Sequence, residues 1–188
     1  MRRQILAAWC VLALVTVLGC GSGTDDAGSE TAAGAEQDVK KAIAWILPRG
    51  DNKDMGGSAI FIKAGSQVDL QVAVQQAPAG THAVHIHENG DCSAPDATSA
   101  GGHWNPTGED HGQWDVAPHH LGDIGNLEVN EDGEGSLTLS TDKWTMGSGA
   151  DNDILGKAVI VHAGADDFTS QPTGAAGGRI GCGVIKAQ

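Results

Sequence analysis

The chain has 188 residues, enough for one domain and little more. Its net charge is −13, from 24 acidic and 11 basic residues, and this balance argues against nucleic-acid binding, which requires a basic surface. It holds 28 glycines, few aromatic residues and no tyrosine. Its core must therefore be built mainly from valine, isoleucine, leucine and alanine, between many turns.

Residues 1–19 have the pattern of a lipoprotein signal peptide. Arg2 and Arg3 precede the apolar run ILAAWCVLALVTVL, whose 14 residues are fewer than the ~20 that a membrane-spanning helix requires. The run ends in VLGC, which resembles the bacterial lipoprotein box, so Cys20 is predicted to be acylated and to become the mature N-terminus. An ordinary secretory signal with an incidental cysteine is the alternative interpretation.

The residues after Cys20 bear on where the chain would be anchored. In Gram-negative bacteria an aspartate directly after the lipid-bearing cysteine tends to retain a lipoprotein at the inner membrane, whereas glycine and serine follow here. We therefore expect a lipid-anchored protein of the bacterial cell envelope or periplasm, with the outer membrane favoured. Residues 20–38 are mostly small or acidic, which predicts a lipidated flexible tether before a domain at 39–188.

Export also bears on the four cysteines. Cys10 would leave with the signal and Cys20 would carry lipid, so Cys92 and Cys182 remain. An exported chain with two remaining thiols is expected to pair them, and two buried free thiols are the alternative. Closing a loop of about 90 residues would contribute ~4–5 kcal/mol in the chain-entropy model.

From residue 39 onward the pattern is that of short β-strands. KAIAWILP and SAIFIKAG are apolar runs bounded by turn residues, and SQVDLQVAVQQ alternates apolar and polar residues. NLEVNEDGEGSLTLS predicts a hairpin, and GKAVIVHAG and RIGCGVIKA predict two more strands. About eight strands without a helical period indicate an all-β sandwich or flattened barrel. Two long segments, 88–119 and 163–178, are expected to be functional loops.

Three histidines fall within HAVHIHENGDC, residues 82–92. Side chains two residues apart on a strand point to the same face, so His85 and His87 can converge on one transition-metal ion. Alone, such a pair is more often a partly exposed polar face. Further ligand-type residues follow in GGHWNPTGEDHGQWDVAPHHLGDIGN and VIVHAGADD: His103, His111, His119, His120, Asp123 and His162.

A loop that merely stays soluble has no reason to prefer imidazole over lysine or serine, so these segments predict metal binding. Four imidazoles in a plane suit Cu(II), whereas three imidazoles and a carboxylate in a tetrahedron suit Zn(II). Two adjacent sites could form if one imidazole served both metals. Spacing alone does not assign the residues.

Five segments together resemble the signature segments of the Cu/Zn superoxide dismutase family, in the family's order: HAVHIHENGDC, GGHWNP, HGQWDVAPHHLGDIGN, VIVHAGADD and GGRIGCGVI. The resemblance extends from about residue 40 to residue 188. It implies an eight-stranded Greek-key sandwich or flattened barrel, and an enzyme that uses copper and zinc to convert superoxide to oxygen and hydrogen peroxide.

The resemblance also implies a role for each residue of the site. The implied copper ligands are His85, His87, His103 and His162. The implied zinc ligands are His103, which would bridge the metals, His111, His120 and Asp123. Arg179 would attract and position the anion, and His103 would also transfer a proton. Asp166, preferred over Asp167 by position, would hydrogen-bond His85 and His111. Cys92 and Cys182 match the family disulfide, His82 matches a structural histidine, and His119 has no ligand counterpart.

Other functions remain open alternatives. A relative of the same fold could store or deliver copper without turnover, and a structural module of the envelope would leave the histidines unexplained. The retained copper-type histidines and Arg179 favour the enzyme, with superoxide as its partner. Whether the chain is a monomer or a homodimer stays undecided.

The loop before Arg179 departs from many relatives, because FTSQPTGAAGG, residues 168–178, carries no charge. Loss of the signal would leave 9 basic against 24 acidic residues, a net charge near −15. Long-range attraction of superoxide is therefore expected to be weak unless lysines such as Lys63 or Lys143 face the mouth of the site.

Overall fold

The computed structural model describes residues 38–188, so the predicted signal peptide, Cys20 and the tether up to residue 37 lie outside the described residues. Within this range the chain forms nine strands, one short 3₁₀ helix and no α-helix. They are β1 (Lys41–Pro48), β2 (Gly56–Ala64), β3 (Gln67–Gln75), β4 (Gly80–His87), η1 (Thr98–Ala100), β5 (Asp123–Val129), β6 (Gly135–Thr141), β7 (Ala158–His162), β8 (Arg179–Val184) and β9 (Lys186–Ala187). No helix in residues 38–188 is long and apolar enough to cross a membrane.

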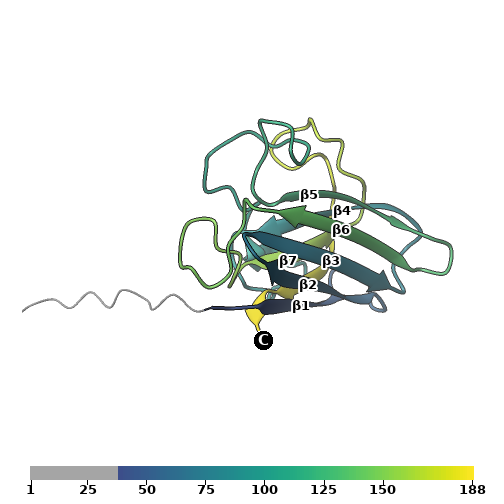
Figure 1. The fold of residues 1–188 in the computed structure, drawn as a ribbon. Helices are drawn as coiled ribbons and strands as arrows, with labels where there is room; N and C mark the ends of the chain where they lie inside the picture. Colours follow the sequence, from purple (N-terminus) through teal and green to yellow (C-terminus); the bar gives the residue numbers. More distant parts are fainter. Residues whose placement is uncertain (1–37) are drawn as a thin grey trace, which may run out of the picture. The chain divides into compact units, whose positions relative to one another are not determined.

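Eight of these strands close into one antiparallel barrel. β2, β3, β6, β5, β4, β7, β8 and β1 are neighbours in that order, and β1 pairs with β2 to complete the circle (Figure 1). β5 and β6 share one residue pair and β1 and β8 share two, so the barrel is flattened into two packed sheets. Because β3 pairs with β6 and β4 pairs with β7, the connections cross in Greek-key fashion. The predicted all-β fold is confirmed.

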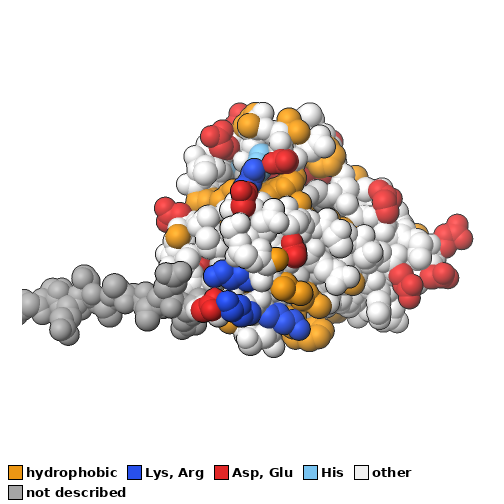
Figure 2. Space-filling model, viewed as in Figure 1, with side chains coloured by type: hydrophobic (Ala, Val, Ile, Leu, Met, Phe, Trp, Pro, Cys, Tyr) orange, Lys and Arg blue, Asp and Glu red, His pale blue; other side chains and the backbone are white. Residues whose placement is uncertain are grey.

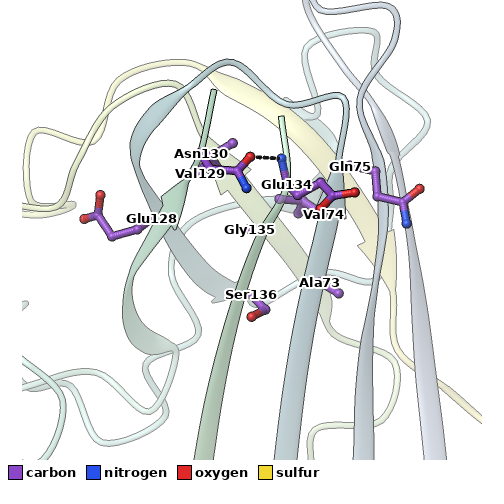
Figure 3. A pocket seen from close by; sticks show the side chains of 9 residues that line it. All are labelled: Ala73, Val74, Gln75, Glu128, Val129, Asn130, Glu134, Gly135 and Ser136. Atoms are coloured by element: carbon purple, nitrogen blue, oxygen red, sulfur yellow. Dashed lines mark hydrogen bonds between the residues drawn. The ribbon is translucent and has the colours of Figure 1, made fainter. Parts of the chain in front are cut away.

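The predicted β5–β6 hairpin is present and is acidic at its end. The side-chain oxygen of Asn130 accepts hydrogen bonds from the backbone N–H groups of Asp132 and Glu134, which holds the turn. Acidic side chains gather at this end of the molecule (Figure 2). Glu128 and Glu134 line a surface groove beside β3 (Figure 3). None of the predicted metal ligands is among the nine residues that line this groove, so the groove is separate from the predicted metal site.

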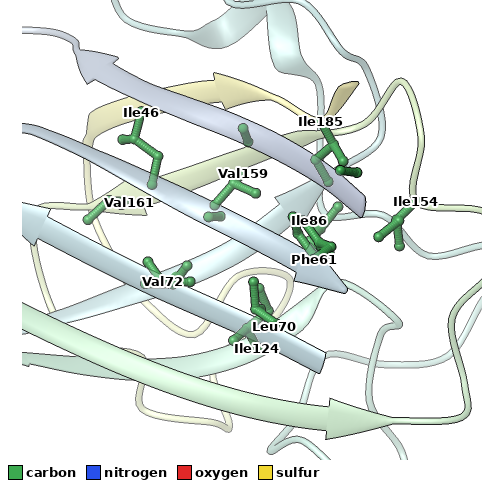
Figure 4. Packing of buried hydrophobic residues seen from close by; sticks show 14 of the residues in the cluster. Ile46, Phe61, Leu70, Val72, Ile86, Ile124, Ile154, Val159, Val161 and Ile185 are labelled. Atoms are coloured by element: carbon green, nitrogen blue, oxygen red, sulfur yellow. The ribbon is translucent and has the colours of Figure 1, made fainter. Parts of the chain in front are cut away.

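The core lies between the two sheets and follows the alternation seen in the sequence. In β3, Val68, Leu70, Val72 and Val74 are buried, while the residues between them are at least partly exposed. Phe61 of β2 packs among aliphatic side chains of the opposite sheet (Figure 4). Valine, isoleucine and alanine thus supply most of this cluster.

Three long connections leave the barrel, rather than the two predicted. Residues 88–122 and 163–178 correspond to the expected loops, and residues 142–157 between β6 and β7 form a third. The third loop contributes Trp144, Met146 and Ile154 to the core. The Trp144 indole N–H donates to the backbone oxygen of Leu121 at 3.0 Å. The apolar residues of this third loop stand among turn residues and follow neither a helical nor a strand period. The sequence pattern therefore did not predict that they pack in the core.

The C-terminal run RIGCGVIKA was predicted as one strand and is two. β8 pairs with β7 and β1, whereas β9 pairs with β1 alone. Between them the backbone N–H of the buried Ile185 donates to the oxygen of Lys157 at 2.9 Å. The pairing of β8 with β7 ends at Val184, opposite Ala158, the first residue of β7.

Candidate metal centre

The histidines come from two adjacent strands and from the loop that follows the first. His85 and His87 lie on β4, and His162 ends β7, which pairs with β4. Val84 and Ile86, which alternate with the β4 histidines, belong to the core, so the imidazoles point to the opposite face of the sheet. His103 joins them because its backbone pairs with that of His87. The β4–β5 loop is thereby folded back over the strand.

The buried ligand-type residues form two groups that share one member. The first group is His85, His87, His103 and His162, and the second is His103, His111, His120 and Asp123. In each group one ligand-type atom per residue lies within 4.8 Å of the others. The assignment that the spacing left open therefore has a structural answer: four imidazoles lie on one side, and three imidazoles with one carboxylate lie on the other.

His103 offers a different nitrogen to each group. Its Nδ1 lies 2.8 Å from Asp123 Oδ1 and 3.4 Å from His120 Nδ1. Its Nε2 is buried and has no hydrogen-bond partner, and its ring lies against that of His85, with the ring centroids 4.0 Å apart and the planes tilted by 43°. One imidazole therefore links the two groups.

Several imidazole nitrogens of the site have no hydrogen-bond partner, and their positions show whether metal ions would fit between them. A buried nitrogen without a partner is costly, yet His85 Nδ1, His103 Nε2 and His111 Nδ1 all lack a hydrogen bond. His111 Nδ1 lies 3.0 Å from Asp123 Oδ2, and the Nε2 atoms of His87 and His162 are 3.4 Å apart. Donors around a tetrahedral zinc at 2.0–2.1 Å are separated by about 3.3 Å. Both donor sets fit a metal.

Asp166 links the two groups by hydrogen bonds to one histidine of each. His85 Nε2 donates to Asp166 Oδ2 at 2.8 Å, and His111 Nε2 donates to Asp166 Oδ1 at 2.9 Å. These bonds turn the other nitrogen of each ring toward the donor groups. Asp167 is exposed and accepts hydrogen bonds from Thr169 and Ser170 instead. The position preferred from the sequence, Asp166, therefore makes the bridge.

Burial keeps three of the imidazoles neutral, the state that a metal ligand needs. Desolvation lowers the pKa of His87 to about 2, that of His162 to about 3 and that of His103 to about 4. Burial would raise the pKa of Asp123, but hydrogen bonds from His103 and His120 hold it below its usual range. His111 differs: burial lowers its pKa, but the hydrogen bond to Asp166 and the charge of Asp123 outweigh that effect and raise it. His87, His103 and His162 are therefore neutral donors beside an ionised Asp123, the protonation states that metal binding requires.

Arg179, the first residue of β8, is anchored beside the first group. Its guanidinium donates to the backbone oxygens of Ala97 and Gly101, both at 2.6 Å. The Gly101 oxygen also accepts a hydrogen bond from His87 Nδ1 at 2.9 Å. The arginine remains partly exposed, so a fixed positive charge faces solvent next to the four imidazoles.

The family model for copper/zinc superoxide dismutase (SODC) matches residues 55–185. The chain belongs to this family. It is 34% identical over 154 residues to the Cu-Zn superoxide dismutase 2 of Aquifex aeolicus, a match that covers 80% of this chain and 88% of the relative.

Solved structures of similar proteins agree with the fold. The clock protein EA4 is 31% identical, with a TM-score of 0.72 over 81% of this chain and 97% of that protein. A double mutant of a SOD-like protein from Bacillus subtilis is 33% identical, with a TM-score of 0.66 over 75% of this chain and 94% of that protein. Membership of the superoxide dismutase family supports dismutase activity with copper and zinc as cofactors, and the two donor groups suit those metals.

Two amides that hold this superoxide dismutase site together were not singled out from the sequence. Asn126 of β5 donates to the backbone oxygen of Asp166 at 2.9 Å and accepts from its N–H at 2.8 Å. Gln171 makes the same two-bond contact with the backbone of His111, at 2.9 Å in each direction. Gln171 ties the two loops together at the site. Gln171 is one of several uncharged polar residues in its loop, so the sequence carried no signal that distinguished it.

The two remaining histidines lie outside both donor groups, as expected. His82 is buried, and its ring nitrogens lie 2.8 Å from the backbone oxygens of His162 and Pro78, so it links β4 to the end of β7. His119 donates to the oxygen of His120 and packs against Trp114.

The predicted disulfide is confirmed. Cys92 and Cys182 are bonded, with their Cα atoms 5.9 Å apart, and the bond attaches the β4–β5 loop to β8. The guanidinium of Arg49, the residue after β1, donates twice to the backbone oxygen of Cys92, at 2.8 and 3.2 Å, and supports the same loop.

Proposed function

We propose that this protein dismutates superoxide outside the cytoplasm and protects the cell envelope. Two superoxide ions and two protons become one oxygen and one hydrogen peroxide molecule, with one superoxide oxidised and the other reduced. The observation that carries the proposal is His103, which presents one nitrogen to each of two buried donor groups beside a fixed arginine.

Both metals have a donor set in this proposal. Copper would be held by His85, His87, His103 and His162, and zinc by His103, His111, His120 and Asp123. Bound copper would supply the one-electron chemistry by cycling between Cu(II) and Cu(I), whereas zinc has no redox chemistry. Asp166 would fix the orientation of one histidine on each side through its two hydrogen bonds.

His103 would carry the proton. Its Nε2 is buried without a protein partner, so it can take up a proton and deliver it to the peroxide that forms. Its Nδ1 stays beside Asp123 and His120 throughout, which keeps the ring in place between the two steps.

Arg179 would attract superoxide and orient it beside the imidazoles. Replacing it with alanine should lower the second-order rate constant on the order of tenfold or more, because a fixed charge at the mouth concentrates the anion. Arg179→Lys should fall between the two, since lysine keeps the charge but cannot reproduce the guanidinium fork. Pulse radiolysis with metal content measured in parallel checks this. Equal rates in all three proteins would contradict the role.

Long-range attraction should be weak. Lys63 pairs with Asp38, Lys143 pairs with Asp115 at 2.9 Å, and residues 168–178 carry no charge. Lowering the ionic strength should therefore raise the rate only slightly, because little positive field extends beyond Arg179. Superoxide decay measured across a range of salt concentrations tests this, and a steep rise at low salt would contradict it.

The decisive test of function compares His162→Ala with His119→Ala in the full chain loaded with copper and zinc. His162→Ala should bind less copper and lose superoxide decay activity. His119→Ala should keep both, because His119 lies outside the donor groups. Stoichiometric copper without turnover in the wild-type chain would instead indicate a copper-binding or copper-delivery protein.

We also propose that Cys20 carries lipid and anchors the protein in the envelope, at the outer membrane. The support is the VLGC motif after a short apolar run. Mass spectrometry of the mature N-terminus should show a diacylglyceryl-modified fragment that begins at Cys20. An unmodified N-terminus at another residue would contradict the anchor.

A further inference from the structure

The basic residues are unevenly distributed in this acidic chain. Residues 38–64 and 186–188 carry six basic and three acidic side chains, whereas residues 65–185 carry three basic and seventeen acidic ones. β1 pairs with both β2 and β9, so the basic segments adjoin one another in the barrel. Figure 2 shows their blue side chains together beside the start of the described chain, next to a patch of hydrophobic side chains.

Large apolar side chains are exposed on the same strands. Trp45 is 65% exposed, Leu47 is 55% exposed and Ile62 is 49% exposed, and they are three of the four large hydrophobic residues exposed in the described chain. The register places Lys41 opposite Ile62, and Lys186 opposite Ile43. We call the surface formed by Lys41, Trp45, Leu47, Ile62 and Lys186 the basal face.

The basal face is also hollowed. Trp45 and Leu47 line a groove of about 230 Å³ together with Arg49, Val184 and Lys186. An apolar groove flanked by two cations suits an amphipathic partner with a negatively charged head. Tryptophan is the side chain most typical of the boundary between water and lipid.

We propose that the basal face docks on an anionic lipid surface, with Trp45 and Leu47 in the headgroup region and the lysines beside lipid phosphates. The docking rests in part on the proposed lipid at Cys20. Seventeen residues separate Cys20 from Asp38, and a chain of that length spans at most about 60 Å. A lipid at Cys20 would therefore keep the start of β1 close to the bilayer, where apolar contact and charge attraction act together.

A second copy of the chain fits this face less well. In a twofold dimer the same patch meets itself, so the basic rim of one copy would face that of the other. An anionic membrane offers the opposite charge. The start of the β4–β5 loop reaches the groove at Cys92, but in Figure 1 the large loops at the top of the view lie across the barrel from β1, so docking leaves the site open to superoxide.

The test uses the full chain, purified after export, with vesicles of phosphatidylcholine alone or with roughly a third phosphatidylglycerol, both with brominated acyl chains. Co-sedimentation reports attachment, and quenching of tryptophan fluorescence by bromine reports contact of the basal face. Among the tryptophans of the described residues, Trp104 and Trp144 are buried, Trp114 is partly buried and Trp45 is the most exposed, so Trp45 should dominate the quenching. Quenching should be strong on anionic vesicles only and should largely disappear in Trp45→Phe.

Reversing the charge of lysines on the basal face distinguishes docking by that face from a general attraction of the protein to anionic vesicles. Lys41→Glu with Lys186→Glu should reduce quenching on anionic vesicles to the level seen on neutral ones. Lys143→Glu is the control, because Lys143 lies in the β6–β7 loop beside Asp115 and the change in net charge equals that of Lys41→Glu alone. Lys143→Glu should leave quenching unchanged, whereas Lys41→Glu should reduce it.

The other possible outcomes decide separately between docking by the basal face and the lipid anchor. Co-sedimentation with both vesicles but no charge-dependent quenching would overturn docking and leave the lipid anchor standing. Quenching on anionic vesicles without co-sedimentation on neutral ones would support docking and overturn the anchor. Failure to sediment with either would overturn both. A dimer in sedimentation equilibrium that Trp45→Glu abolishes, together with absent quenching, would overturn docking in favour of a second copy.

Discussion

Gly174→Ala is expected to weaken zinc binding by about 10- to 100-fold, the range found when an outer partner of a metal ligand is disturbed. A methyl group at Gly174 would collide with Asp166 Oδ1 and would press on His111 Nε2. The carboxylate would have to move, and it would release both His85 and His111 from the bonds that orient them. Competition against a chromophoric zinc chelator measures the change.

Gly149→Ala is the matched control. Gly174 has a φ of +66° and Gly149 a φ of +70°, so alanine is strained to a similar degree at both, at a cost of about 1 kcal/mol. No atom outside the neighbouring residues lies within 4 Å of a methyl group at Gly149. The control should therefore lose stability but keep its zinc affinity. Equal affinity in both variants would show that Gly174 does not hold Asp166 in place.

Replacing Cys92 and Cys182 with serine is expected to lower the free energy of unfolding by about 4–5 kcal/mol, because the bond closes a loop across 90 residues. Most of that loss comes from the greater freedom of the unfolded chain. Guanidinium denaturation of the metal-free protein measures it without the contribution of bound metal.

Reduction of the wild-type protein provides the comparison for the serine variant. Reduced wild type and Cys92→Ser/Cys182→Ser should unfold at the same denaturant concentration if the bond itself stabilises the fold. A loss below about 1 kcal/mol in both, the size of an ordinary substitution, would show that Arg49 and the surrounding contacts hold the loop without the bond.

The sequence by itself determined the features that depend on short-range pattern. Alternating residues such as Val68 and Leu70 identified strands, because side chains of a strand alternate between core and solvent. His85 and His87 were identified as a pair for the same reason. The disulfide followed from counting the cysteines that export would leave.

Spacing left open which histidine belongs to which donor group; the family resemblance implied an assignment, and the tertiary structure shows the contacts that produce it. His103 reaches both groups because the loop after β4 folds back onto His87, and Asp166 reaches His85 across 81 residues of sequence. The contacts of Asn126 and Gln171, the third loop and the basal face likewise depend on how the barrel closes. Such contacts join residues far apart in the chain, and no local period records them.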